Sequence, residues 1–209
     1  MKDETKTTII TAGLNLLPYV GGSIATVYSS MKDKKEKERL ELFFSETSES
    51  IKKFDEKFTS ILEVTTHDDE YLTMLIEKIS RIVEKEARKS KRDSLKSLLI
   101  NSLLHGVDNH SYGQLEFFAD ALDSLSEQDV IIMIALYKEE NLVVVNSINI
   151  SDTNDPYYVL ASINKIRAFG FLESFTGDFH IGAVDNELNQ SVKVSQLGKL
   201  FVDFCLKTA

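Results

Sequence analysis

The stretch that decides the fold class of this chain is residues 155–184, DPYYVLASINKIRAFGFLESFTGDFHIGAV. Asp155 stands where it can cap a helix that begins at Pro156, because the missing N–H of proline costs nothing at a first helical position. Apolar side chains follow at helical spacing, and Gly170 can end the helix in the left-handed conformation that glycine tolerates. The remainder predicts a β-hairpin that turns at Gly177–Asp178.

The residues on either side of this stretch predict more short elements. Ser126 followed by Asp129 is a typical helix start, and the helix is expected to run to about residue 141. Residues 142–150, LVVVNSINI, are rich in β-branched side chains and suggest a strand. Val192–Val194 is expected to be a returning strand, and Ser195 is placed to cap a last helix.

This order of elements resembles a winged helix-turn-helix domain. The segments that carry the resemblance are LSEQD at 125–129, IRAFGFL at 166–172 and VSQLGKLF at 194–201. The polar, glycine-containing segment 106–113 is the expected linker, so a winged-helix domain with a small β-wing is predicted over 113–209. A helical region before such a domain also resembles bacterial abortive-infection alpha-type proteins, which implies a part in phage defence.

The first half, residues 1–106, predicts an N-terminal helical bundle, so the whole chain is expected to be mainly α. Residues 7–31 carry no charge and are interrupted by Pro18 and by Gly21–Gly22. We interpret them as a hairpin of two short helices packed on the rest of the protein. Two alternatives stay open for the same residues: a membrane-seeking segment and a surface for a protein partner.

Residues 32–64 predict one long helix with a heptad seam. Apolar positions recur at alternating spacings of four and three, as in coiled coils: Leu40, Phe44, Thr47, Ile51, Phe54, Phe58 and Ile61. Such a seam suits a helix inside a bundle as well as the contact between two copies of the chain. We assign it to self-association, which predicts a homo-oligomer.

Charge is distributed unevenly along the chain. The sequence has 24 basic and 33 acidic side chains, a net charge of −9. Residues 112–209 hold 6 basic and 14 acidic side chains and therefore carry −8 of that charge. Such an excess repels phosphate and disfavours nucleic acid as a partner. A basic run between Arg81 and Lys96 is typical of a solvated helix end, with nucleic-acid binding as the alternative.

The predicted helix 156–169 offers one exposed face to a partner, formed by Tyr157, Tyr158, Asn164, Lys165 and Arg167. In a winged helix this face would enter the major groove of DNA. Two cations are few for that task, because neutralising phosphates supplies most non-specific affinity for DNA. We therefore predict that the face docks a protein, and a DNA-binding transcriptional regulator is the alternative.

Nothing in the sequence indicates an enzyme, a cofactor or a metal site. Glycine-rich phosphate-binding loops and nucleophile elbows are missing, and Cys205 lies among apolar residues that predict a core position. A single cysteine fits a reducing compartment, and the protein is expected in the cytoplasm. The sequence predicts a non-enzymatic bacterial interaction or regulatory protein, with a membrane-active effector acting through residues 7–31 as a further alternative.

Overall fold

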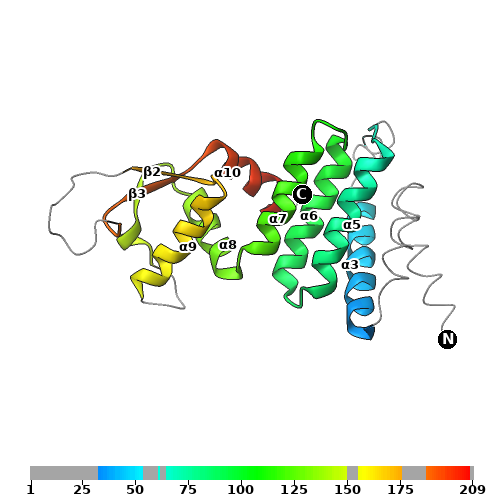
Figure 1. Ribbon diagram of the computed structural model, residues 1–209, viewed down its shortest axis with the longest axis horizontal. Coiled ribbons are helices and arrows are strands. Elements are labelled where there is room, and N and C mark those ends of the chain that lie inside the picture. The colour runs from blue at the N-terminus through cyan, green and yellow to red at the C-terminus, as the bar shows by residue number, and fades with distance from the viewer. Residues whose placement is uncertain (1–32, 54–60, 62–64, 150–154, 176–186, 208–209) are drawn as a thin grey trace. The chain divides into compact units, whose positions relative to one another are not determined.

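The structure is a computed structural model that describes residues 33–53, 61, 65–149, 155–175 and 187–207. It is mainly helical, with a small three-stranded antiparallel sheet (Figure 1). Contacts divide the chain into two compact units, the first ending at Asp123 and the second running over Ser124–Lys207. The expected class, mainly α with a little β, is confirmed.

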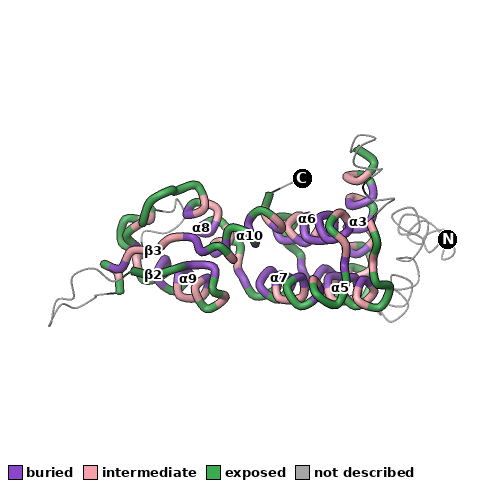
Figure 2. Tube along the Cα trace, turned by 90° about the horizontal axis from the view of Figure 1, so that it is seen from above, coloured by how far each residue is buried: buried purple, intermediate pink, exposed green. Residues whose placement is uncertain are grey.

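The described part of the first unit is helical. Its helices are α3 (Lys34–Lys52), α5 (Asp69–Lys85), α6 (Lys89–His105) and α7 (Tyr112–Ser124). Helix α3 packs against both α5 and α6. Leucine, isoleucine and phenylalanine side chains from all four helices are buried, so burial of apolar area is the main source of its stability. Figure 2 colours these helices buried along one side and exposed along the other.

Part of the predicted self-association seam lies in this core, which corrects the assignment for those residues. Leu40, Phe44 and Thr47 are completely buried within the chain, against the neighbouring helices. Helix α3 ends at Lys52, so it is shorter than the predicted helix 32–64. Ile51 is half-buried and Ile61 is exposed. Phe54 and Phe58, like residues 7–31, lie outside the described residues. The buried part of the seam therefore cannot bind a second copy.

The second unit alternates helices with short strands. Its elements are α8 (Glu127–Tyr137), β1 (Val143–Val144), η1 (Val145–Ser147), α9 (Pro156–Ala168), β2 (Leu172–Phe175), β3 (Ser191–Val194), α10 (Gln196–Phe201) and η2 (Val202–Leu206). The strand order is β1–β3–β2, and both pairs are antiparallel. Ser191 pairs with Val144 on one side and with Phe175 on the other, which fixes the register. Helix α9 packs against α8 and β2.

The predicted helix starts in this unit are confirmed, whereas α8 ends at Tyr137 and only Val143–Val144 of the predicted strand 142–150 is a strand. Ser126 and Asp129 form a reciprocal capping box, and Asp155 accepts a hydrogen bond from the backbone N–H of Tyr157. Gly170 has a φ of 70° at the end of α9, where other residues would be strained. The predicted hairpin turn falls within residues 176–186, outside the described part of the chain. Strand β2 pairs with the returning strand β3.

The boundary between the units lies later than the predicted linker 106–113. Helix α7 belongs to the first unit, because Phe118 is buried there and two carboxylates of α7 bond to Lys78 of α5. Glu116, Asp120 and Asp123 of α7 therefore belong to the first unit and not to the C-terminal one. Residues 124–207 hold 6 basic and 11 acidic side chains, so their net charge is −5. The acidic excess of the second unit is smaller than the sequence suggested.

The closing motif VSQLGKLF has a packing explanation. A Cβ atom on Gly198 would lie 2.2 Å from the carbonyl oxygen of Phe171, so no larger residue fits without a backbone shift. Ser195 anchors the same contact: its N–H donates to Phe171 O at 2.9 Å and its Oγ donates to Gly170 O at 2.7 Å. The rings of Phe171 and Phe201 stack with centroids 4.3 Å apart. The motif therefore holds α10 against the start of β2.

Candidate functional site

The aromatic pair of α9 is the part of the predicted face that stays exposed. Tyr157 and Tyr158 are 52% and 47% exposed in the first turn of the helix. The side chain of Asp155 caps this turn, accepting from Tyr157 N at 2.9 Å, and Pro156 fixes its backbone. The two rings are thus held at a rigid helix start. Exposed tyrosines combine a large apolar surface with a hydroxyl group, as protein interfaces prefer.

The cation Lys165 of the same face is committed to the fold. Its Nζ lies 3.0 Å from Oδ2 of Asp129, whose side chain is only 4% exposed. Burial raises the pKa of Asp129, but hydrogen bonds from Ser126, Ser162 and Lys165 outweigh this effect and hold the pKa below its ordinary value. Asp129 therefore stays ionised, and Lys165 adds to the stabilisation of its charge by Ser126 and Ser162. Lys165 joins α9 to the capped start of α8.

The second cation, Arg167, is also engaged. Its Nη2 donates to Asn164 Oδ1 at 2.8 Å, and its Nη1 donates to Gln190 Oε1 at 3.0 Å. Gln190 is buried beside β3, and the same Nη1 lies 3.4 Å from Ser174 Oγ on β2. The second unit is thus held together in part by contacts of Asn164, Lys165 and Arg167. The five predicted face residues therefore do not form one free surface.

Part of the basic run of the first unit builds the turn between α5 and α6, whereas Arg81, Lys85 and Lys89 are exposed, as predicted for a solvated helix end. The carboxylate of Glu86 is buried and accepts two bonds from the guanidinium of Arg88, at 2.8 and 2.7 Å. Lys91, 4% exposed, lies 3.4 Å from Glu86 and donates to the carbonyl of Asp123 at 2.9 Å. Arg92 donates to backbone carbonyls of the same turn. The run therefore offers less charge to nucleic acid than the sequence suggested.

The two charged groups of this buried ion pair, Glu86 and Lys91, both have lowered pKa values. The hydrogen bond from Arg88 is the main reason that the pKa of Glu86 falls from 4.5 to about 2. Burial lowers the pKa of Lys91 more than the charge of Glu86 raises it. Both groups depend on each other, because an isolated charge in this position would be costly. The cluster is an internal clamp of the fold.

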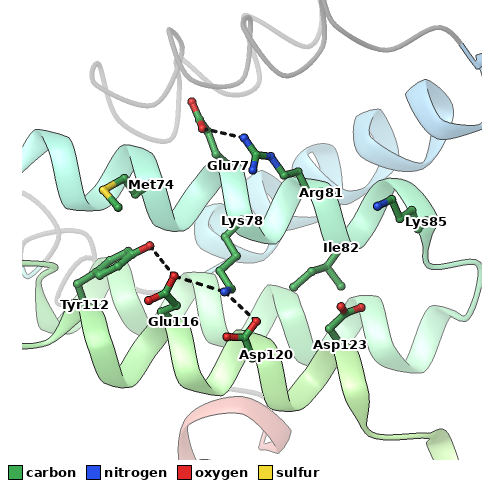
Figure 3. A pocket seen from close by; sticks show the side chains of 10 residues that line it. All are labelled: Met74, Glu77, Lys78, Arg81, Ile82, Lys85, Tyr112, Glu116, Asp120 and Asp123. Atoms are coloured by element: carbon green, nitrogen blue, oxygen red, sulfur yellow. Dashed lines mark hydrogen bonds and ion pairs between the residues drawn. The ribbon is translucent and has the colours of Figure 1, made fainter.

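A groove between α5 and α7 is a feature of the first unit that the sequence did not predict (Figure 3). It has a volume of about 440 Å³ and walls of opposite charge. The α5 wall carries the cations Lys78, Arg81 and Lys85 and one carboxylate, Glu77, and the α7 wall carries Glu116, Asp120 and Asp123. These residues recur at intervals of three and four along each helix. That spacing was the available signal, but the sequence did not show that the two rows would be neighbours.

Lys78 spans the groove and joins its walls. Its Nζ lies 2.7 Å from Asp120 Oδ1 and 3.4 Å from Glu116 Oε1. Burial lowers the pKa of Lys78, but these two carboxylates outweigh the effect and raise the pKa above its ordinary value. Tyr112 donates to Glu116 at 3.2 Å, and its pKa is raised by burial and by that carboxylate. Four groups thus form one network along α7.

The single cysteine lies in the core, as its apolar neighbours predicted. Cys205 is completely buried, and burial raises the pKa of its thiol well above the ordinary value, so it remains a protonated core residue. Across the described ranges, no group of three or more His, Cys, Asp or Glu side chains could hold a metal ion. The helices in those ranges are also too short or too polar to cross a membrane.

Comparisons with known proteins found no match to this chain among family models, curated proteins or solved structures.

Proposed function

We propose that the second unit is a protein-docking module that presents Tyr157 and Tyr158 of α9 to a protein partner. The observation that carries the proposal is the contrast along one helix. Its aromatic side chains are half-exposed, whereas Lys165 and Arg167 are held by Asp129, Asn164 and Gln190. A surface with exposed aromatic groups and committed cations favours protein over DNA.

A winged-helix arrangement of this unit is part of the proposal. It is supported by the order helix, strand, helix, strand, strand and closing helix, and by the sheet order β1–β3–β2. In such a domain α9 would be the recognition helix. The regulatory role, and the part in phage defence that the sequence resemblance implies, stay predictions.

The test compares the whole chain with the double variant Tyr157→Ser, Tyr158→Ser in its native host, using affinity purification and quantitative mass spectrometry. Leu142→Ser is the matched control, because Leu142 is an equally exposed apolar residue of the same unit. We expect one protein to copurify in near-stoichiometric amount with the wild type and the control, and at least tenfold less with the double variant. Equal recovery with all three proteins would contradict the proposal.

The rival function is tested on the same samples. A fluorescently labelled DNA duplex of random sequence is titrated with the wild type at low salt, where electrostatic binding is strongest. We expect no saturable binding. Saturable binding that weakens with salt, and weakens further when Arg167 is changed to Gln, would instead identify a DNA-binding regulator.

A further inference from the structure

We propose that the face formed by α5 and α7 binds the same face of a second copy of this chain. The proposal starts from two rows of opposite charge that lie side by side on one unit (Figure 3). The basic row is Lys78, Arg81 and Lys85, with one carboxylate, Glu77, paired to Arg81, and the acidic row is Glu116, Asp120 and Asp123. This contact is separate from the aromatic docking surface on α9.

The two helices run in the same direction, which decides the symmetry. Met74 and Tyr112 lie at one end of the groove, and Lys85 and Asp123 lie at the other (Figure 3). The bonds from Lys78 to Glu116 and Asp120 fix this register. A two-fold axis parallel to the helices therefore places α5 of each copy over α7 of the other without reversing either helix. Such a contact is isologous: the same patch serves both subunits.

In this arrangement the cations Arg81 and Lys85 meet carboxylates, whereas Glu77 of the α5 wall stays paired with Arg81 of its own chain. Arg81 faces Asp120 of the partner subunit, and Lys85 faces Asp123 of the partner subunit. The two-fold axis repeats each pair, so four intermolecular ion pairs form. A two-fold axis across the helices would instead place cations over cations, which is unfavourable. The charge pattern thus selects one dimer geometry.

The groups needed for these pairs are accessible. The side chain of Arg81 is 69% exposed, although its Nη2 lies 3.5 Å from Oε2 of Glu77 on the same helix. Asp120 is 57% exposed although it bonds to Lys78. Within the described residues, the Lys85 ammonium makes no hydrogen bond or ion pair, and the side chain of Met74 is exposed on the same face. Exposed pairs are individually weak, so we expect an association that depends on several pairs and on salt.

The test is a charge exchange on the whole chain, followed by light scattering after size-exclusion chromatography. Lys85→Glu places a carboxylate opposite Asp123 of the partner subunit, and Asp123→Lys creates the reverse clash between two ammonium groups. We expect the wild type to run as a dimer of the 23.6 kDa chain and each single variant as a monomer. An equimolar mixture of the two variants should recover the dimer, because the introduced carboxylate of one chain then faces the introduced ammonium of the other.

The controls separate charge from position. Lys89→Glu and Glu140→Lys make the same charge changes at exposed residues that do not line the groove, and both should remain dimers. Thermal unfolding of each variant checks that it is folded. The wild-type dimer should dissociate at about 1 M salt, where the Debye length is about 3 Å. A wild type that is monomeric at low salt, or folded variants that all stay dimeric alone, would overturn the proposal.

Discussion

The apolar seam of α3 and the exposed face of α9 were both predicted as interaction surfaces. In the structure, part of the α3 seam is buried, whereas the tyrosines of the α9 face are exposed. Leu40 and Phe44 of the seam are completely buried against helices of the same chain. Tyr157 and Tyr158 remain half-exposed at the start of α9. Helical periodicity shows which side chains point the same way, but it does not show what lies opposite them. A seam can therefore complete a core as readily as an interface.

The largest effect is expected from breaking the buried seam. Phe44→Ala removes a fully buried ring, so the free energy of unfolding of the first unit should fall by about 3–5 kcal/mol. Leu42→Ala on the same helix is the control, because Leu42 is 48% exposed and should change stability by less than about 0.5 kcal/mol. Denaturant unfolding followed by circular dichroism measures both. A Phe44→Ala protein of unchanged stability that loses only its oligomeric state would restore the seam as an interface.

The next effect tests whether Arg88 and Lys91, the part of the basic run that contacts Glu86, stabilise the fold. Glu86→Gln leaves Lys91 buried without its carboxylate and removes one of the two oxygens that accept from the guanidinium of Arg88. The free energy of unfolding at neutral pH should therefore fall by about 3 kcal/mol. Glu84→Gln, two residues earlier on α5, should change it by less than about 0.5 kcal/mol. Equal effects of the two substitutions would show that these contacts do not stabilise the fold.

The stability difference between the wild type and Glu86→Gln should also depend on pH. The pKa of Glu86 is lowered to about 2 in the folded state, from 4.5. A lowered carboxylate pKa means that the stabilisation is complete above pH 4.5 and is lost as the pH falls towards 2. The stability difference between wild type and Glu86→Gln should shrink over that interval. Denaturant unfolding at several pH values measures it, and a difference that stays constant would contradict the shift.

A further prediction concerns the second unit, where the motif VSQLGKLF at 194–201 holds α10 against the start of β2. Gly198→Ala places a Cβ atom 2.2 Å from Phe171 O, and the backbone must move to accept it. We expect the free energy of unfolding of this unit to fall by about 1–3 kcal/mol. Gly113→Ala in α7 is the control: no atom lies within 4 Å of its added Cβ, so stability should rise by up to about 1 kcal/mol. The reverse order of effects would remove the packing explanation for the motif.

Local signals predicted the second unit well. The capping residues Ser126, Asp155 and Ser195 act within a few residues of themselves, so a single sequence is enough to locate them. The same holds for Gly170, whose positive φ ends α9. The order of helices and strands in the described part of this unit followed from these signals.

Features that depend on distant residues were not predicted. The boundary at Asp123 depends on bonds from α7 to Lys78, which precedes Glu116 by 38 residues in the chain. The commitment of Arg167 depends on Gln190, which the fold brings beside α9. Periodicity and composition contain no information on such pairs. This explains why the helices were anticipated while the roles of their charged side chains were not.

The smallest expected loss of stability comes from Lys165→Gln, which tests whether the cation of the α9 face is held by the fold. Lys165→Gln removes the ion pair to Asp129, which keeps its bonds from Ser126 and Ser162, so the free energy of unfolding should fall by only about 1–2 kcal/mol. Lys138→Gln, an exposed residue after α8, should be neutral within about 0.5 kcal/mol.

The pH dependence of the Lys165→Gln variant identifies the group responsible. The pKa of Asp129 lies below its ordinary value of 3.8 in the folded protein, so its stabilisation is present above that pH and fades below it. Removing Lys165 should bring the pKa of Asp129 back towards 3.8, which carboxyl NMR shifts would record. If this pKa and the stability both stay unchanged, Lys165 is free to bind a ligand, and the distinction between committed cations and exposed tyrosines on α9 fails.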